Sequence, residues 1–84
     1  MRWEQLDEPV KVRADFLGGL VSPVLFRRGD ARIAVRAVNT RWQDARAGHR
    51  LCYFSVTADT GDMYQLCFNT ADLTWRLEYV MYDG

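Results

Sequence analysis

The chain has 84 residues and carries 11 basic and 11 acidic side chains, so its formal net charge is zero. Of its residues 49% are hydrophobic and 26% are charged, which is typical of a globular domain and excludes a disordered, collagen-like or coiled-coil chain. No apolar run approaches the roughly 20 residues of a membrane span, and the first residues do not lead into a signal-peptide core. We therefore expect a single domain over residues 1–84, located in the cytoplasm.

Period-two alternation predicts three strands in the N-terminal half of the chain. They cover Val10–Ala14, Val24–Arg27 and Arg32–Val38. A tight turn at Arg28–Asp30 joins the second to the third, and residues 16–23 are expected to form a loop because they hold two adjacent glycines and a Ser-Pro step. On the third strand, the residues expected to face the core are Ile33, Val35 and Ala37.

The segment after the third strand has the signals of a short helix. Thr40 and Gln43 stand at the spacing of a capping box, and Gly48 is suited to end a helix. We therefore expect a helix or a single helical turn near residues 41–47.

Three further strands are predicted after residue 50. Two alternating apolar runs flank Asp59–Gly61, which predicts a hairpin with Gly61 in the left-handed conformation. The last strand covers Leu73–Met81, and Val80 and Tyr82 leave room for a bulge near its end. The pairs that this hairpin predicts are Ala58 with Asp62, Val56 with Tyr64, Phe54 with Leu66, and Cys52 with Phe68.

These elements define the expected fold. Every connection is too short for the crossover that a parallel sheet needs, so the class is all-β. We predict a six-stranded antiparallel meander curled into a small, partly open barrel, an arrangement that hides sheet edges. A flat sheet that dimerises through its open face is the alternative.

The predicted hairpin also separates the two cysteines. Cys67 lies opposite Tyr53, on the other face from Cys52. A disulfide needs Cβ atoms about 3.8 Å apart, which opposite faces of one hairpin cannot supply. We expect two free thiols in a reducing compartment.

Few residues offer chemistry. His49 is the sole histidine, and its three-residue separation from Cys52 puts the two on opposite faces of a strand. Together with Cys67 they are fewer than the four N or S ligands of a zinc site. The aspartates are scattered among turns, where such residues usually bond their own backbone. We expect no catalytic residue, no metal site and no cofactor.

Charge is distributed unevenly along the chain. Residues 11–50 hold nine basic and three acidic side chains, a net +6, whereas residues 51–84 carry a net −4. Ten of the 11 basic residues are arginine, whose planar guanidinium suits phosphate or carboxylate groups and stacks on aromatic rings. The asymmetry predicts a surface with one positive and one negative region.

Two groups of residues are candidate binding residues. The first could hold single-stranded nucleic acid by combining cations with an exposed aromatic ring, although the acidic second half and zero net charge argue against a nonspecific binder. Its members are Arg27, Arg32, Arg36, Arg41, Trp42 and Arg50. The second is the apolar segment around Phe16 and Leu17, which either folds back over the barrel mouth or offers a patch to a protein partner or a second copy.

Several segments together resemble a small bacterial domain of unknown function. They are Pro9-Val10, Phe26 before Arg28-Gly29, Ile33–Val35 with Val38 and Trp42, Tyr53–Val56, Gly61, Tyr64–Leu66 and Trp75–Asp83. Members of that family occur as short free-standing proteins, and also fused to the C-terminal end of catalytically inactive, Y-family polymerase-like proteins of DNA-damage mutagenesis cassettes. The resemblance implies an accessory role in DNA-damage tolerance, by docking proteins or touching DNA, and it identifies no catalytic residue.

The sequence favours a noncatalytic binding module that acts as an adaptor for a protein partner or forms a homodimer. We expect no association with a membrane. Binding of single-stranded nucleic acid is the alternative. An enzyme built around Cys52 or Cys67 is a third hypothesis with less support.

Overall fold

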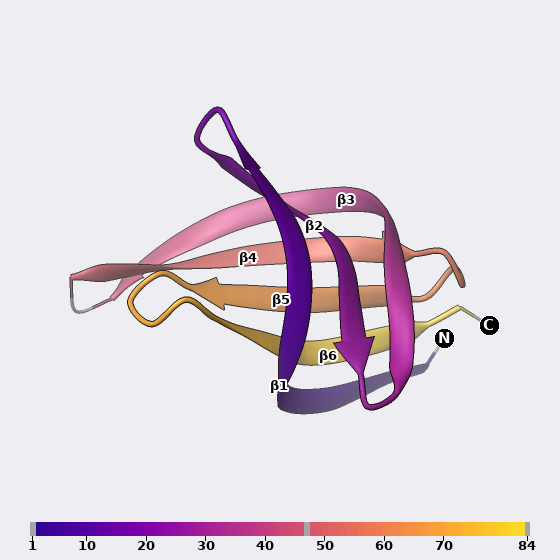
Figure 1. The fold of residues 1–84 in the computed structure, drawn as a ribbon. Helices are drawn as coiled ribbons and strands as arrows, with labels where there is room; N and C mark the ends of the chain where they lie inside the picture. The colour runs from indigo at the N-terminus through magenta and orange to yellow at the C-terminus, as the bar shows by residue number, and fades with distance from the viewer. Residues whose placement is uncertain (1, 47, 84) are drawn as a thin grey trace.

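The computed structural model describes residues 2–46 and 48–83, which form a closed barrel of six antiparallel strands (Figure 1). Each strand pairs with the next, and the last returns to pair with the first. The strands are β1 (Arg2–Leu17), β2 (Leu20–Arg28), β3 (Ala31–Arg46), β4 (His49–Ala58), β5 (Met63–Asn69) and β6 (Thr74–Tyr82). The predicted all-β meander is confirmed, and the barrel is closed where the sequence predicted a partly open one.

Closure depends on the length of β1. The N-terminal part of this strand pairs with β6 and its C-terminal part pairs with β2, so one strand reaches both neighbours. A bulge at Leu6-Asp7 bends it between the two, and Asp7 takes a positive φ of 48°, which aspartate tolerates better than most residues. Arg76 on β6 fixes this bend, because its Nε lies 3.0 Å from Asp7 Oδ1 and its Nη2 donates to the Asp7 carbonyl oxygen at 2.7 Å.

Residues 16–23 form part of a hairpin, and the predicted loop is wrong. Phe16 pairs with Val21 and Leu17 with Leu20, so the turn consists of Gly18 and Gly19 alone. Both glycines have positive φ, 59° and 79°, which is the requirement of the two-residue turn that matches strand twist. The end of this β1–β2 hairpin projects from the barrel (Figure 1).

The helix predicted near residues 41–47 is also wrong. Residues 41–46 continue β3 and pair with β4 as far as Arg46 opposite His49, while residue 47 lies outside the described residues. The capping-box spacing is a local signal for a helix. The continuous ladder of hydrogen bonds with β4 outweighs it, because this ladder already pairs the backbone N–H and C=O groups that a helix would have paired. No helix occurs in the described part of the chain, and hence none there is long and apolar enough to cross a membrane.

The hydrophobic core lies inside the barrel and is supplied unevenly. Strands β4, β5 and β6 contribute nine of the eleven residues in the buried cluster, whereas β2 and β3 contribute one each. The members from β4–β6 are Phe54, Val56, Ala58, Tyr64, Leu66, Phe68, Trp75, Leu77 and Val80, and the other two are Phe26 and Ile33.

Bulges decide which residues of β3 and β6 face that core. Register shifts in the β3–β4 ladder exchange the faces of β3, so Val38 packs against the core while Ala37 is exposed, which corrects the predicted inward position of Ala37. The bulge expected in the last strand is present at Glu78, and it turns Val80 fully inward. One extra residue reverses the alternation that a regular strand would follow.

The predicted register of the β4–β5 hairpin is confirmed: Val56 pairs with Tyr64, Phe54 with Leu66 and Cys52 with Phe68. Next to the turn, the Ala58 N–H donates to the Asp62 carbonyl oxygen at 2.8 Å. Cys67 lies opposite Tyr53, and both cysteines are free, as expected from their opposite faces.

Candidate binding surfaces

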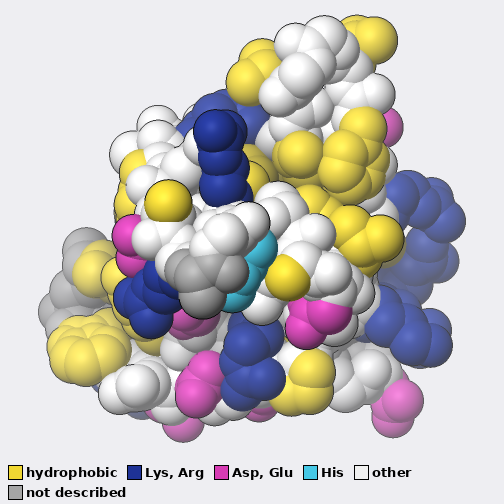
Figure 2. Space-filling view, turned by 90° about the vertical axis from the view of Figure 1, so that its left-hand side faces the viewer, with side chains coloured by type: hydrophobic (Ala, Val, Ile, Leu, Met, Phe, Trp, Pro, Cys, Tyr) yellow, Lys and Arg dark blue, Asp and Glu magenta, His cyan; other side chains and the backbone are white. Residues whose placement is uncertain are grey.

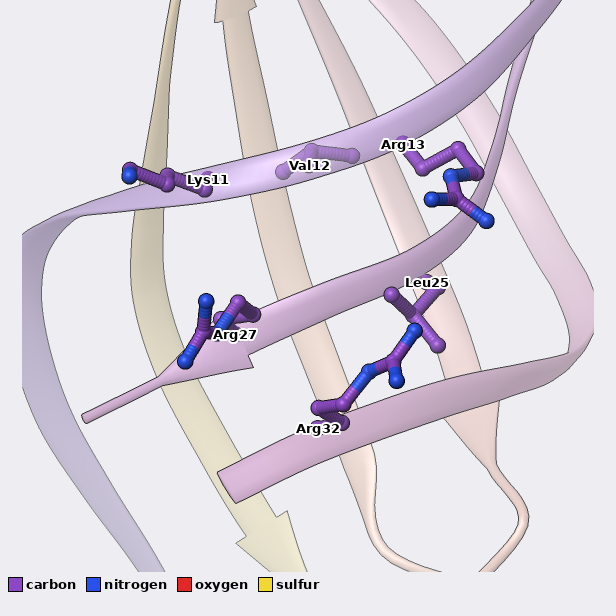
Figure 3. Close-up of a pocket in the computed structure, with 6 residues that line it drawn as sticks. All are labelled: Lys11, Val12, Arg13, Leu25, Arg27 and Arg32. Atoms are coloured by element: carbon purple, nitrogen blue, oxygen red, sulfur yellow. The ribbon is translucent and has the colours of Figure 1, made fainter. Parts of the chain in front are cut away.

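Four cations gather on the outside of β1, β2 and β3. Lys11 on β1 pairs with Arg27 on β2, and Arg27 pairs with Arg32 on β3, so three positive side chains form a row across adjacent strands. Arg13 lies two residues further along β1, opposite Leu25. Together, Lys11, Arg13, Arg27 and Arg32 are named the basic face. They line a shallow hollow of about 470 Å³, and Arg13 and Arg32 extend from the two outer strands toward Leu25 between them (Figure 3).

None of these four cations is neutralised within the described residues. The ion pairs found there are Arg28 with Glu8, Arg46 with Asp44, and Arg76 with Asp7, and no hydrogen bond from a basic-face side chain is present. Like charges directly opposite each other destabilise a sheet. In Figure 2, basic side chains gather along the right-hand edge, on the side where the front strands of Figure 1 lie. The row creates a positive surface, and we expect it to cost stability.

A second hollow, the mouth cleft, lies between the β1–β2 hairpin and the extended β3–β4 hairpin. Its volume is about 230 Å³, and its lining includes Leu20, Val21, Arg41, Gln43, Arg50 and Cys52. The Arg50 guanidinium is exposed, with Nη1 3.4 Å from Gln43 Oε1. An anionic group entering the cleft would meet Arg50 at its rim.

Arg41 holds the hairpin against β3. Its Nη2 donates to Ser22 Oγ at 3.1 Å and its Nη1 donates to the Val21 carbonyl oxygen at 2.5 Å. The guanidinium also lies 5.7 Å from the centre of the Phe54 ring, within the range of a cation–π contact. Arg41 is therefore occupied as a structural brace.

The end of the β1–β2 hairpin presents apolar side chains to solvent. Phe16 is 64% exposed, Leu17 83% and Leu20 57%, and these three residues are named the apolar tip. Phe16 touches the barrel with one edge, its ring centre 6.0 Å from that of Phe68, and Val21 packs against the core. Figure 2 shows hydrophobic side chains near the top of the molecule, the end at which the hairpin projects in Figure 1. The segment thus combines both alternatives considered from the sequence.

The structure brings together some of the predicted binding residues and separates others. Arg27 and Arg32 are neighbours, whereas Arg41, Trp42 and Arg50 line the mouth cleft. Arg36 is exposed at a bulge of β3. Trp42 stacks on Tyr53 of β4, with ring centres 5.3 Å apart and planes 7° apart, so it provides no aromatic platform within the basic face.

Sequence reasoning missed Lys11 and Arg13. The inward alternation of Val10, Val12 and Ala14 already placed them on the outer face of their strand. Their partners could not be identified, however, because a loop was expected where β1 in fact turns directly into β2. Recognition of the Gly18-Gly19 turn would have aligned Lys11 with Arg27.

The thiol of Cys67 is shielded on the outer face between Tyr53 and Arg76. Only 6% of Cys67 is exposed, and burial raises the pKa of its thiol from 9.0 to about 11, with the Glu78 carboxylate adding to the increase. A thiol that stays protonated near neutral pH is a weak nucleophile. No group of three or more histidine, cysteine or acidic side chains stands close enough to hold a metal ion in residues 2–46 and 48–83.

Comparisons with protein-family models, with curated proteins and with solved structures found no match to this chain.

Proposed function

We propose that the protein is a noncatalytic binding module that docks a partner protein on its apolar tip. The observation that carries this proposal is the exposure of Leu17 and Leu20 at the end of a projecting hairpin. Apolar side chains clustered in water commonly mark an interaction site. Arg41 braces the same hairpin, which reduces the ordering that a partner would have to impose.

The surroundings of the tip support the same proposal. Protein interfaces commonly have an apolar centre within a polar rim. Phe16 and the two leucines supply the apolar part, and the adjoining mouth cleft supplies Gln43 and Arg50. An apolar segment with a neighbouring acidic side chain would complement both.

The resemblance to the small bacterial domain suggests the class of partner. We place the protein in the bacterial cytoplasm and assign it an accessory role in DNA-damage tolerance, with a Y-family polymerase-like protein of a mutagenesis cassette as its partner. The segments that support this assignment, above all Trp75–Asp83, form much of β6 and its exit from the barrel. The apolar tip is where we expect the partner to bind.

Binding can be measured between the purified protein and the polymerase-like protein encoded by the same host, by calorimetry or biosensor. The test variant is Leu17→Ser/Leu20→Ser, which removes both exposed leucine side chains of the tip. We expect a loss of affinity of at least about tenfold, because truncation of a few central residues dominates most interfaces.

Leu73→Ser is the matched control. Leu73 is also a strongly exposed leucine, but it lies in the turn between β5 and β6. Equal weakening by the control variant, or no binding by the unaltered protein, contradicts the proposal. Concentration-dependent dimerisation that the tip variant abolishes would instead identify a second copy as the occupant.

A further inference from the structure

We propose that the basic face binds the phosphate backbone of a single-stranded nucleic acid. This surface is separate from the apolar tip, and the inference does not depend on the proposed docking of a protein there. It concerns Lys11, Arg13, Arg27 and Arg32, two of which the sequence pattern did not single out.

Within the described residues, no carboxylate forms an ion pair with the basic face. Lys11, Arg27 and Arg32 are aligned side by side on three strands. A chain of phosphates laid across the row would remove the repulsion between these neighbours. Arginine is suited to this ligand because its fork of N–H donors matches two phosphate oxygens.

The lining of the basic face favours a nucleic acid over an acidic protein as the ligand. The hollow between the cations is lined by Val12 and Leu25, with no aromatic or methionine side chain. Protein interfaces are enriched in aromatic residues and methionine at their centre, whereas nucleic-acid interfaces are more polar and far more positive. The composition of the basic face matches the second kind.

The shape of the basic face favours a single strand over a duplex. The cations lie in a shallow hollow on the sheet, and the β1–β2 hairpin that projects beyond them ends in the apolar tip, which holds no cation to enter the major groove of a duplex. Proteins that bind single-stranded nucleic acid commonly hold its sugar-phosphate backbone in a groove lined by cations. Trp42 lies elsewhere on β3 against Tyr53, so base stacking contributes little and binding should depend weakly on base sequence.

Acidic residues limit the extent of the site. Asp15 continues the outer face of β1 beyond Arg13, and Asp30 lies in the turn between Arg27 and Arg32. The positive area therefore covers a few phosphates, which is compatible with zero net charge for the whole chain. We expect modest affinity and a strong dependence on salt.

The experiment measures fluorescence polarisation of labelled 12-nucleotide single strands titrated with the purified protein. For four neutralised phosphates, the slope of log K against log salt should be about −3, so affinity should fall about 50-fold between 50 and 200 mM salt. In Arg27→Gln/Arg32→Gln the slope should be roughly halved, and affinity at 50 mM should fall about tenfold or more.

Arg2→Gln/Arg46→Gln is the matched control, because it removes the same charge from two exposed arginines outside the basic face. It should bind as the unaltered protein does, and circular dichroism should show both variants folded. The inference is overturned if the single strand does not bind at 50 mM salt, or if the control variant loses as much affinity as the test variant. It is also overturned if a duplex of the same length binds more tightly, or if polyglutamate displaces the labelled strand as well as an unlabelled single strand does. None of these results bears on the apolar tip, since no partner protein is present.

Discussion

The two halves of the barrel differ in how they use their side chains. Strands β4–β6 supply most of the core. Several of their long outward-facing side chains have polar partners: Gln65 Nε2 donates to Glu78 Oε1 at 2.5 Å, and Arg76 forms an ion pair with Asp7. Strands β1–β3 supply two core residues and carry both the basic face and the apolar tip. The difference indicates that β4–β6 provide most of the stability, which allows β1–β3 to keep unpaired charges and exposed leucines for binding.

The largest expected effect is in the core of β5. Leu66 is fully buried, so Leu66→Ala should lower the free energy of unfolding by about 2–5 kcal/mol, through lost burial and the cavity left behind. Leu25→Ala is the matched change in the other half, where Leu25 is half-buried on the outer surface and should cost about 1 kcal/mol or less. Urea denaturation measures both values, and equal losses would contradict the division between the halves.

A turn in each half gives the next comparison. Gly61 in the β4–β5 turn has a φ of 95°, and an added Cβ would lie 2.7 Å from Asp83 Oδ2. Gly61→Ala should therefore destabilise the protein by about 2–3 kcal/mol, because both the backbone and the Asp83 contact must shift. Gly29→Ala in the β2–β3 turn, with a φ of 59° and open space around it, should cost about 1 kcal/mol.

Loss of less than about 1 kcal/mol for Gly61→Ala in urea denaturation would indicate that the C-terminal segment yields easily to the added methyl group. The Gly29 variant separates this contact from the conformational cost that both glycines share.

The shielded thiol of Cys67 gives a pH test of the β4–β6 half. Because burial raises its pKa from 9.0 to about 11, the folded state holds this proton more tightly than the unfolded chain. The resulting stability is complete below pH 9 and is lost as pH rises through about 11. Tyr53 and Tyr64 also have raised pKa values, so the measurement is the difference between the unaltered protein and Cys67→Ala. That difference should shrink from pH 8 to 11; a constant difference would show that the thiol titrates normally.

How much the sequence could predict also differs between the halves. The β4–β5 pairing was predictable residue by residue, because Asp59–Gly61 set the turn and strict alternation set the face. In β3, bulges and a ladder reaching Arg46 overrode local signals, which is why Ala37 and the helix near residues 41–47 were assigned wrongly. The neighbouring positions of Arg27 and Arg32 followed from one hairpin, but those of Lys11 and Arg13 required the unrecognised pairing of β1 with β2.

The smallest expected effect has the opposite sign. Arg27 lies between two other cations in the row, so Arg27→Gln should raise the free energy of unfolding by about 0.2–1 kcal/mol at low salt. The gain should vanish near 1 M salt, where the screening length falls to about 3 Å. Arg76→Gln is the control, since it breaks the ion pair with Asp7 and should destabilise the bend of β1. A fall in stability on removing Arg27 would mean that the row is internally compensated. A rise would mean that these strands give up stability to keep a charge that the fold does not need, which is the cost expected of a binding surface.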